Sequence, residues 1–413
     1  MAKIYKNVSS TVEKPLKEKI VLAYSGGLDT SVSIKWLQEK YDAEVITLTL
    51  DLGQKEDFKE IAARSRAVGA IKHFEVDVKD EFVDGYVLPS VRANGMYEGK
   101  YPLATALGRP LIATKLVEVA EKEGATAVAH GCTGKGNDQV RIDVTVRALN
   151  PSLRVIAPVR EWNMSRDQEI LYARKHNIMV KPSNSIFSID QNLWGRSIES
   201  GPLEDPNTEP PAGAFEWVTQ PMDAPDTPGY IELGFVEGVP RSVDGIEKDY
   251  LSLIRHVNEF AGKHGVGIVD HIEDRIVGLK VRDIYEAPAA AIILAAHQEL
   301  EKLVCTIHQN QFKAGLDRQW AYLVYAGLWW EPLRSDLDAY MEAVNAYVTG
   351  KIGLELYKGT ARVVTRSSPN AVYDQSLASF AESGGLFSQT ASPGFIELWT
   401  LQSRMAWRLR NGG

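Results

Sequence analysis

A glycine-rich stretch with the sequence SGGLDTS occupies residues 25–31 and combines two adjacent glycines with hydroxyl and carboxylate side chains. It follows the apolar run 20–24, which indicates a buried strand, and precedes a segment, 32–37, whose apolar positions suit a helix. Adjacent glycines at such a strand-to-helix turn let backbone N–H groups approach an anion closely, and the positive end of the helix dipole adds to the attraction. The stretch therefore predicts a phosphate-binding loop.

The residues around the glycine pair narrow the kind of phosphate loop. No Gly-Lys-Ser/Thr ending follows, which excludes the loop that grips β- and γ-phosphates, and the glycine spacing does not fit a dinucleotide-binding fingerprint. The stretch resembles the SGGxD loop of the pyrophosphatase-loop ATP enzymes, which holds the leaving pyrophosphate while a substrate oxygen attacks the α-phosphorus. A plain tight turn is the less favoured alternative, because serine, aspartate and further hydroxyls accompany the glycines.

A second glycine-dense stretch, HGCTGKGNDQVR at residues 130–141, directly follows a predicted strand. Since ligands of parallel sheets bind at the carboxyl ends of the strands, this stretch is expected beside the phosphate loop. Its glycines permit turns close to a ligand, and its polar side chains supply donors and acceptors of both signs. These side chains are Thr133, Lys135, Asn137, Asp138 and Arg141. A solvated loop is the alternative, and Cys132 is interpreted as a small side chain that fills the turn, since no CxxC motif accompanies it.

Strands and helices alternate from Lys19 to about residue 180. The predicted strands are 20–24, 44–50, 73–78, 126–130 and 154–158, and the predicted helices are 29–41, 56–68, 80–93, 107–123 and 165–176. Such alternation indicates right-handed crossovers and a parallel sheet with helices on both faces. The fold class is therefore predicted as α/β, with a parallel-sheet adenine-nucleotide-binding domain first.

The pattern changes after a connection at 199–230 that contains seven prolines. Beyond it we predict an α+β synthetase domain with hairpins at 231–236/241–246 and 352–357/361–365, and helices at 249–264 and 286–313. An apolar C-terminal helix at 394–410 needs cover, either from its own chain or from another subunit. The predicted domains are an extension (1–18), the ATP-binding domain (19–180), the synthetase domain (181–385) and an oligomerisation helix (386–413).

The composition excludes several classes of function. The 413-residue chain has a net charge of −8, which offers no general attraction to nucleic acid. Its two cysteines exclude a disulfide scaffold and a cysteine-rich metal site, and they suit a reducing cytoplasm. No apolar run reaches the ~20 residues of a membrane span, and no signal peptide is seen. We expect a cytoplasmic protein with no protein-ligated metal and no nucleic-acid or membrane partner.

Six stretches together resemble the argininosuccinate synthase family. They are AYSGGLDTS at 23–31, LGQKEDF at 52–58, YPLATALGRP at 101–110, HGCTGKGNDQVR at 130–141, AGKHGVG at 261–267 and IYEAPA at 284–289. The resemblance runs from about Lys19 to the C-terminus. It implies a ligase of arginine biosynthesis that joins citrulline to aspartate with ATP through citrullyl-AMP, releasing AMP and pyrophosphate. It also implies Mg²⁺ with the ATP, and a homotetramer built with the C-terminal helix.

The resemblance assigns site residues by position. ATP-binding positions are Ala23, Tyr24, Ser25, Gly26, Gly27, Leu28, Asp29, Thr30, Ser31, Leu50 and Gly131. Aspartate-binding positions are Thr133, Asn137 and Asp138, and citrulline-binding positions are Tyr101, Asn137, Arg141, Ser188, Ser197, Glu273 and Tyr285. The catalytic candidates are Asp29, Asn137 and Asp138. One departure is visible, because Ala106 stands where several relatives carry a hydroxyl, with Thr105 beside it.

The charges of these residues suggest roles. Arg141 suits a carboxylate and Glu273 suits an α-ammonium group. Asp138 suits the ammonium of aspartate, and receipt of a proton by Asp138 is a hypothesis. Among rival functions, a tRNA-modifying enzyme would need a basic RNA-binding surface, and a nucleotide sensor would not need the loop at 130–141. An amidotransferase would need a Cys-His glutaminase unit, so the transferred nitrogen is expected from a bound amino acid.

Overall fold

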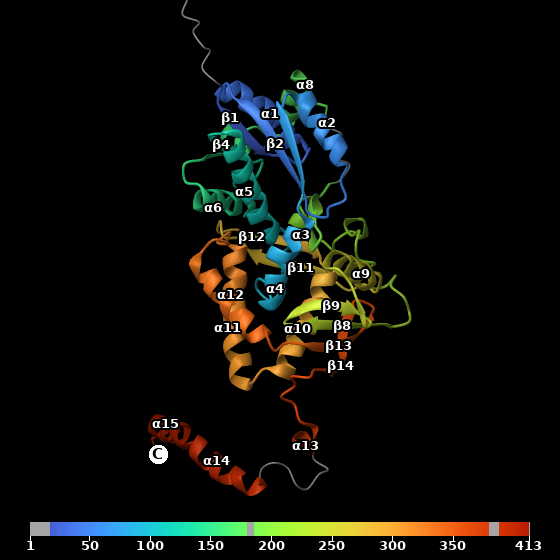
Figure 1. The fold of residues 1–413 in the computed structure, drawn as a ribbon, viewed down its shortest axis with the longest axis vertical. Coiled ribbons are helices and arrows are strands. Elements are labelled where there is room, and N and C mark those ends of the chain that lie inside the picture. The colour runs from blue at the N-terminus through green and yellow to red at the C-terminus, as the bar shows by residue number, and fades with distance from the viewer. Residues whose placement is uncertain (1–16, 180–185, 380–387, 413) are drawn as a thin grey trace, which may run out of the picture.

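The computed structural model describes residues 17–179, 186–379 and 388–412, and Figure 1 shows two packed parts followed by a separate C-terminal arm. The first part is built on a five-stranded sheet, ordered β3-β2-β1-β4-β5, in which every neighbouring pair runs parallel. Its strands are β1 (Lys19–Ala23), β2 (Glu44–Asp51), β3 (Lys72–Asp77), β4 (Ala127–Ala129) and β5 (Arg154–Ile156). The predicted parallel sheet is confirmed, and most of the predicted extension 1–18 falls outside the described residues.

Helices cover both faces of this sheet, as predicted. They are α1 (Leu28–Tyr41), α2 (Phe58–Val68), α5 (Ala104–Glu123), α6 (Asp138–Leu149), α7 (Pro158–Trp162) and α8 (Arg166–Lys175). On β1, Ile20 and Leu22 belong to the same apolar cluster as Ile34 of α1, whereas Val21 belongs to the cluster that contains Leu111 of α5. Successive strand residues point to opposite faces, so one helical layer lies on each side.

Two helix predictions in this part need correction. The single helix predicted at 80–93 is divided into α3 (Lys79–Phe82), a π-helical turn η1 (Val83–Val87) and α4 (Leu88–Arg92). Pro89 lacks the N–H that would bond to the carbonyl of Gly85, so the regular helix is interrupted there. Helix α6 was not predicted at all, because Val, Ile and Thr dominate its sequence and favour strands over helices.

The second part contains two antiparallel sheets. The four-stranded sheet, ordered β11-β12-β7-β6, consists of β6 (Ser188–Asn192), β7 (Gly195–Glu199), β11 (Ile268–Asp274) and β12 (Lys280–Glu286). The five-stranded sheet, ordered β10-β9-β8-β13-β14, consists of β8 (Gly229–Val236), β9 (Val239–Val243), β10 (Ile246–Glu247), β13 (Gly350–Tyr357) and β14 (Thr360–Ser367). Both predicted hairpins are confirmed in this sheet. The four-stranded sheet was not predicted, because its strands are short and largely polar.

Three long helices pack in the second part together with α9 (Tyr250–Lys263), which was predicted at 249–264 and has Asp249 as its N-cap. The single helix predicted at 286–313 is wrong. The chain instead forms α10 (Pro288–Val304) and α11 (Ile307–Tyr325), and α12 (Pro332–Asn345) follows. The break occurs because Thr306 begins α11 with a capping box, in which its side chain and that of Gln309 bond to each other's backbone N–H.

The proline-rich connection is fastened to β12 by a buried carboxylate. Glu286 is fully buried and accepts hydrogen bonds from the backbone N–H groups of Glu216, Trp217 and Val218 at 2.8–3.1 Å. It also accepts one from Arg196 at 2.5 Å. The only regular structure of this connection between β7 and β8 consists of the short 3₁₀ turns η2 (Gly201–Glu204) and η3 (Ala212–Ala214). It is therefore a strap on the second part.

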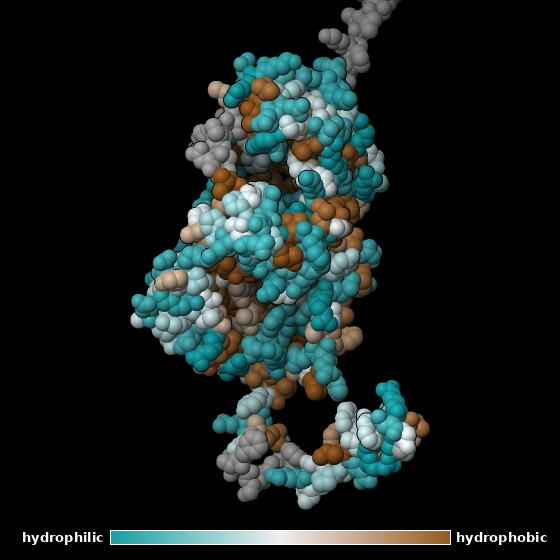
Figure 2. Space-filling model, turned by 180° about the vertical axis from the view of Figure 1, so that it is seen from behind, coloured by the Kyte–Doolittle hydropathy of each residue, from teal (hydrophilic) through white to brown (hydrophobic). Residues whose placement is uncertain are grey.

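The C-terminal arm stands away from the body in Figures 1 and 2. After α13 (Gln375–Ala378) it comprises η4 (Gln389–Ala391), α14 (Ser392–Trp399) and α15 (Leu401–Asn411), so two helices replace the single one predicted at 394–410. Large apolar side chains along the arm are exposed, namely Phe395, Ile396, Leu398, Trp399, Leu401, Met405, Trp407 and Leu409. The described part of this chain does not cover them.

One apolar core spans both parts of the body. It includes Val21 and Leu111 from the first part together with Trp194, Trp320 and Leu354 from the second. The cleft described below therefore lies between parts that share buried side chains. Within the described ranges, no helix has both the length and the apolar character required to cross a membrane.

Candidate active site

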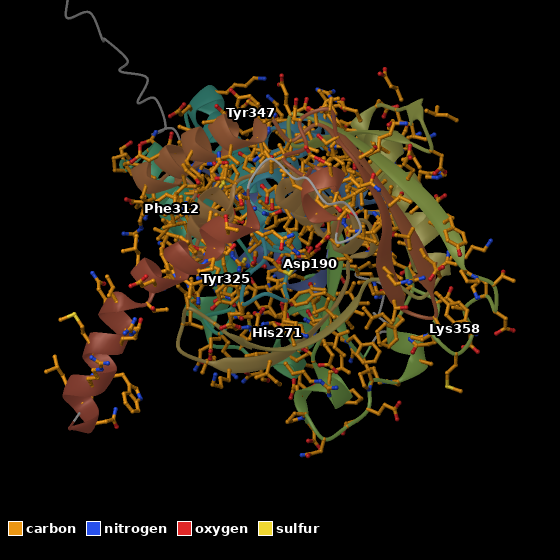
Figure 3. All side chains as sticks on the ribbon, turned by 90° about the horizontal axis from the view of Figure 1, so that it is seen from below. Asp190, His271, Phe312, Tyr325, Tyr347 and Lys358 are labelled. Carbon is orange, nitrogen blue, oxygen red and sulfur yellow. The ribbon has the colours of Figure 1, made fainter. Side chains whose placement is uncertain are left out.

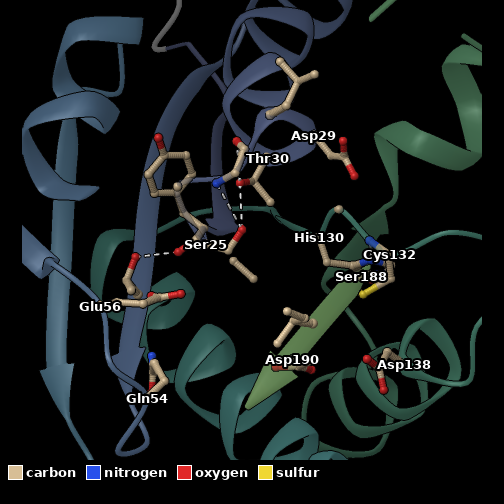
Figure 4. A pocket seen from close by; sticks show the side chains of 18 of the residues that line it. Ser25, Asp29, Thr30, Gln54, Glu56, His130, Cys132, Asp138, Ser188 and Asp190 are labelled. Atoms are coloured by element: carbon tan, nitrogen blue, oxygen red, sulfur yellow. Dashed lines mark hydrogen bonds between the residues drawn. The ribbon is translucent and has the colours of Figure 1, made fainter. Parts of the chain in front are cut away.

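The phosphate loop forms one wall of a large cavity at the carboxyl edge of the parallel sheet (Figure 4). The cavity has a volume of about 1320 Å³. Gly27 is the N-cap of α1 and provides no side-chain cap, so the first N–H groups of α1 stay available to an anion. Gly26 has a φ of 77°, and a Cβ atom there would lie 3.0 Å from Ile61 Cγ1. Only glycine fits this position without strain.

The cavity contains most of the predicted ATP-binding set. Ala23, Tyr24, Ser25, Gly26, Gly27, Leu28, Asp29, Thr30, Leu50 and Gly131 all line it. Ser31 does not, because it is fully buried and its hydroxyl pairs with that of Tyr24 at 3.0 Å. Apolar side chains from β2, α5 and α6, including Leu48, Ile112 and Ile142, give the cavity a surface that suits a flat aromatic base.

Gly131 joins the second glycine-rich loop to the first. A Cβ atom added to Gly131 would lie 2.9 Å from Thr30 Cγ2, so the two loops touch where only a glycine leaves room. Strand β4, which precedes the second loop, pairs with β1, which precedes the phosphate loop. The sheet register therefore brings both predicted motifs to one cavity.

Asp138 links the cavity to a more buried group of residues. It is the first residue of α6, and its two carboxylate oxygens accept from Arg141 Nη1 at 2.9 Å and from Arg109 Nη2 at 2.8 Å. Burial opposes ionisation, but the Arg109 and Arg141 guanidinium groups outweigh it and hold the pKa of Asp138 below its usual value. Asp138 is therefore a carboxylate at neutral pH. In this arrangement it is a weak proton acceptor.

Most of the predicted citrulline-binding residues converge in a buried, hydrogen-bonded cluster next to Asp138 and Arg141, which we call the chamber. The rings of Tyr101 and Tyr285 stack with centroids 4.2 Å apart. Glu273 accepts hydrogen bonds from the hydroxyls of Tyr285 at 2.7 Å and Tyr325 at 2.9 Å. The side-chain amide of Asn137 donates to the Tyr325 hydroxyl at 2.7 Å. Figure 3 labels Tyr325 and Asp190 in the central part of the body in this view.

The side chains of the chamber are buried and its phenols are held neutral. Glu273 is 3% exposed and Arg141 is also 3% exposed. Burial raises the pKa of Tyr101 to about 12, and burial followed by nearby acidic groups raises the pKa of Tyr285 well above its usual value. The tyrosines are therefore hydrogen-bond donors across the physiological pH range. Oriented donors and one carboxylate in buried surroundings suit a zwitterionic amino acid better than an apolar ligand.

The remaining predicted residues are less closely grouped. Ser197 is the strand partner of Tyr285, and its hydroxyl donates to the carbonyl of Asp190 at 3.3 Å. Ser188 is exposed and lines the cavity of the phosphate loop rather than the chamber. Thr133 is exposed on the second loop and does not line the cavity. Of the aspartate-binding set, only Asp138 lines the cavity, while Asn137 faces the chamber.

Several residues of the site were not predicted individually. Arg109 lies within the quoted stretch YPLATALGRP, so the signal was present in the sequence. Tyr325 ends α11 and reaches the chamber only because that helix packs against α5, which the sequence pattern does not reveal. Its ring also stacks on Tyr97 with centroids 3.5 Å apart.

An acidic pair lies behind the phosphate loop. Arg166 Nη1 donates to Asp29 at 2.5 Å and to Glu169 at 3.1 Å. Burial, followed by the neighbouring Asp29 carboxylate, raises the pKa of Glu169 to about 7. The Oε1 atom of Glu169 is buried and has no hydrogen-bond partner among the described residues. This pair places a proton-sensitive group beside the expected pyrophosphate.

Comparisons with known proteins agree with this geometry. The family model described as the arginosuccinate synthase N-terminal HUP domain matches residues 19–179, and the arginosuccinate synthase C-terminal domain matches residues 187–406. The argininosuccinate synthase of Pyrococcus furiosus is 52% identical over 394 residues, which cover 95% of each chain. That of Rubrobacter xylanophilus is 53% identical over 388 residues, covering 94% of each chain.

A third relative matches over nearly its whole length. The argininosuccinate synthase of Pyrobaculum aerophilum is 51% identical over 393 residues, which cover 95% of this chain and 99% of the relative. The similarity therefore spans both parts of the body and most of the arm. The chain belongs to the argininosuccinate synthase family.

Proposed function

We propose that this chain joins citrulline to aspartate with ATP, forming argininosuccinate, AMP and pyrophosphate in arginine biosynthesis. The observation that carries the proposal is the contact between two glycine-rich loops at Gly131 and Thr30. Asp138 lines the same cavity as the phosphate loop, and its ion-pair partner Arg141 lies over the ring of Tyr325, which donates to Glu273 of the chamber. An ATP α-phosphate and an amino acid bound in these places would be neighbours.

ATP would occupy the cavity with its base against the apolar wall near Leu50 and its phosphates against residues 25–31. The backbone N–H groups of this loop and the N-terminus of α1 would bind the pyrophosphate. Arg64 supports the loop by donating to the Gly26 carbonyl. Arg166 and Arg174, which also line the cavity, supply positive charge at its rim.

Citrulline would bind in the chamber. Arg141 would hold its carboxylate and Glu273 its α-ammonium group, replacing hydrogen bonds that the chamber residues now make to one another. Ala106 has no hydroxyl, and Thr105 supplies one on the same turn. Its Oγ1 lies 2.7 Å from the Tyr101 hydroxyl. This pair would set the position of the ureido end.

The reaction needs positioning and charge stabilisation rather than a protein nucleophile. The ureido oxygen of citrulline attacks the α-phosphorus, and the bond from that phosphorus to pyrophosphate breaks, which gives citrullyl-AMP. The aspartate ammonium then loses a proton to solvent, the resulting amine attacks the ureido carbon, and AMP leaves with the former ureido oxygen. The phosphate loop stabilises the developing charge on pyrophosphate. Asp138, kept ionised by two guanidinium groups, is better suited to hold the aspartate ammonium than to accept a proton.

The residues present fit a magnesium ion bound together with ATP. Asp29 is an oxygen ligand on the phosphate loop, lines the cavity and has a side chain that is 42% exposed. Within the described ranges, no group of three acidic, histidine or cysteine side chains is arranged to hold a metal alone. Asp29 would therefore share the ion with phosphate oxygens, and Mg²⁺ would neutralise the leaving pyrophosphate.

The same proposal covers the domains and the assembly. Residues 19–180 would form the ATP-binding domain, 181–385 the synthetase domain and 386–413 an oligomerisation arm after the extension 1–18. The exposed apolar side chains of α14 and α15 would be covered by other copies in a homotetramer. Two cysteines, both free where the structure describes them, suit a reducing cytoplasm.

Pyrophosphate release tests the proposed reaction. The protein is incubated with ATP and Mg²⁺ together with citrulline alone, aspartate alone, or both. Release that requires citrulline and turns over fully only with aspartate is the expected result. No release under any of the three conditions would overturn the proposal.

A further inference from the structure

Arg109 is a buried cation on the wall that the ATP cavity shares with the proposed aspartate position. It lies in the second turn of α5, and its side chain is 18% exposed. Its guanidinium group lies between Asp138 at the start of α6 and Asp190 on β6. Figure 4 shows both carboxylates on the same side of the cavity. Arg109 therefore connects the two parts of the body at the cleft.

The ion pairs of Arg109 use only a fraction of its donors. Both bonds, at 2.8 Å to Asp138 and a shorter one to Asp190, come from the single nitrogen Nη2. The Nε atom is buried and has no partner among the described residues. A guanidinium group carries five N–H donors in a planar fork, so most of this fork is unused.

A second unpaired donor lies on the other side of Asp138. Arg141 is 3% exposed, and its Nη2 atom is also buried and unpartnered within the described ranges. Leaving a buried charged donor without an acceptor is costly, so natural sites rarely retain one without a reason. Two such donors flank one carboxylate in a substrate cleft. An additional anionic acceptor brought to this cluster would satisfy hydrogen-bonding capacity that the protein leaves unused.

We infer that Arg109 binds a carboxylate of the aspartate substrate, a role that rests on the proposed function. Aspartate carries two carboxylates and one ammonium group. The cluster offers a matching set, because Asp138 suits the ammonium and Arg109 has free donors for a carboxylate. Arg141 keeps its proposed role of binding the carboxylate of citrulline. Arg109 thereby selects a dicarboxylic amino acid as the nucleophile for the second step.

Separate assays of the two steps test this inference. In Arg109→Gln, citrulline-dependent pyrophosphate release in a single turnover is expected to persist, while the KM for aspartate rises at least about 30-fold. Arg109→Lys keeps the charge without the planar fork and is expected to lie between this variant and the unmodified protein. Persistence of the first step also shows that the variant is folded.

Two analogues of aspartate, each lacking one carboxylate, distinguish direct binding of a carboxylate by Arg109 from a purely structural role of Arg109. Asparagine lacks the side-chain carboxylate of aspartate, and β-alanine lacks its α-carboxylate. If Arg109 holds a carboxylate, the preference for aspartate over the analogue that lacks this group collapses in Arg109→Gln. A merely structural role would slow all three nucleophiles by the same factor, and that result would overturn the inference.

Asp190→Asn is the matched control. It removes one ion pair from Arg109 but leaves the guanidinium group, and the Asp190 side chain is 37% exposed. The KM for aspartate is expected to stay within about fivefold of the unmodified value. A rise as large as that of Arg109→Gln would contradict the inference, as would loss of the first step in both Arg109 variants. Absence of citrulline-dependent release in the unmodified protein would instead reject the proposed function itself.

Discussion

Gly131 lies so close to Thr30 that a Cβ atom on the glycine would stand 2.9 Å from the threonine Cγ2 atom. This distance is well below an ordinary contact between carbon atoms. The two residues belong to loops separated by about a hundred positions in the sequence, and each loop follows a strand of the same parallel sheet. The proposed ATP site therefore depends on a contact that only glycine permits.

Gly131→Ala is expected to weaken ATP binding by pushing the two loops apart. Overpacking of this size costs about 1–3 kcal/mol, so the KM for ATP should rise roughly tenfold. Gly134→Ala in the same loop is the control, because the nearest atom to its added Cβ lies 4.0 Å away. Steady-state kinetics at varied ATP measures both variants. Equal KM values for the two would show that the contact does not shape the site.

Tyr325→Phe is expected to raise the KM for citrulline more than the KM for ATP. The change removes the hydroxyl that accepts from Asn137 and donates to Glu273. Each buried partner left unpaired costs about 1–3 kcal/mol, so the KM for citrulline should rise about tenfold or more. The exposed Tyr322 on the same helix provides the control Tyr322→Phe. An unchanged KM for citrulline in Tyr325→Phe would show that the Tyr325 hydroxyl does not contribute to citrulline binding.

Glu169→Gln is expected to stabilise the protein increasingly as the pH rises. The pKa of Glu169 is raised from 4.5 to about 7, so the folded state keeps a proton that the unfolded state loses in this range. The unmodified protein therefore loses stability from about pH 4.5 upward until Glu169 ionises in the folded state near pH 7. A shift of this size corresponds to a penalty on the order of 3 kcal/mol at pH 8.

Denaturant unfolding at pH 5 and pH 8 measures this effect. The difference in free energy of unfolding between Glu169→Gln and the unmodified protein should be below ~1 kcal/mol at pH 5 and should grow to about 3 kcal/mol at pH 8. Glu60→Gln offers a control on α2, where the carboxylate is 38% exposed. A difference that is the same at both pH values would show that Glu169 titrates normally.

Trp399→Ser combined with Trp407→Ser is expected to break the assembly into smaller species. These side chains are 76% and 68% exposed in the single chain, and burial of each large aromatic in a partner contributes about 1.5–3 kcal/mol. Gln402→Ser on the same arm is the control. Light scattering after gel filtration should give a tetramer for the control and a lower mass for the double variant. An unchanged mass would assign tetramer formation to the body.

The elements predicted most accurately from the sequence are those marked by glycines or by continuous apolar runs. The phosphate loop, the parallel sheet and the hairpin at Lys358 and Gly359 each follow from glycine placement and apolar runs. Helix α6 was missed although it carries Asp138, because its many β-branched residues suggest a strand and Asn137 gives it no side-chain cap. The break before α11 was missed because the capping residues Thr306 and Gln309 lie inside an apolar pattern.

The sequence predicted which residues belong to the site, but it did not predict the contacts between them. Asp138 and Arg141 were recognised as charged residues, but their mutual ion pair and the pairing of Asp138 with Arg109 depend on how α5 and α6 pack. Tyr325 reaches Glu273 from a helix with no motif. Such contacts between distant segments arise from tertiary packing, which local sequence patterns do not encode.

Transfer of oxygen from citrulline to AMP tests the central claim most directly. The protein is supplied with ATP, Mg²⁺, aspartate and citrulline whose ureido oxygen is ¹⁸O, and the AMP is analysed by mass spectrometry. Attack of the ureido oxygen on the α-phosphorus predicts one ¹⁸O atom in each AMP formed. Unlabelled AMP, with the ¹⁸O found in pyrophosphate or in water, would contradict a site that adenylates citrulline.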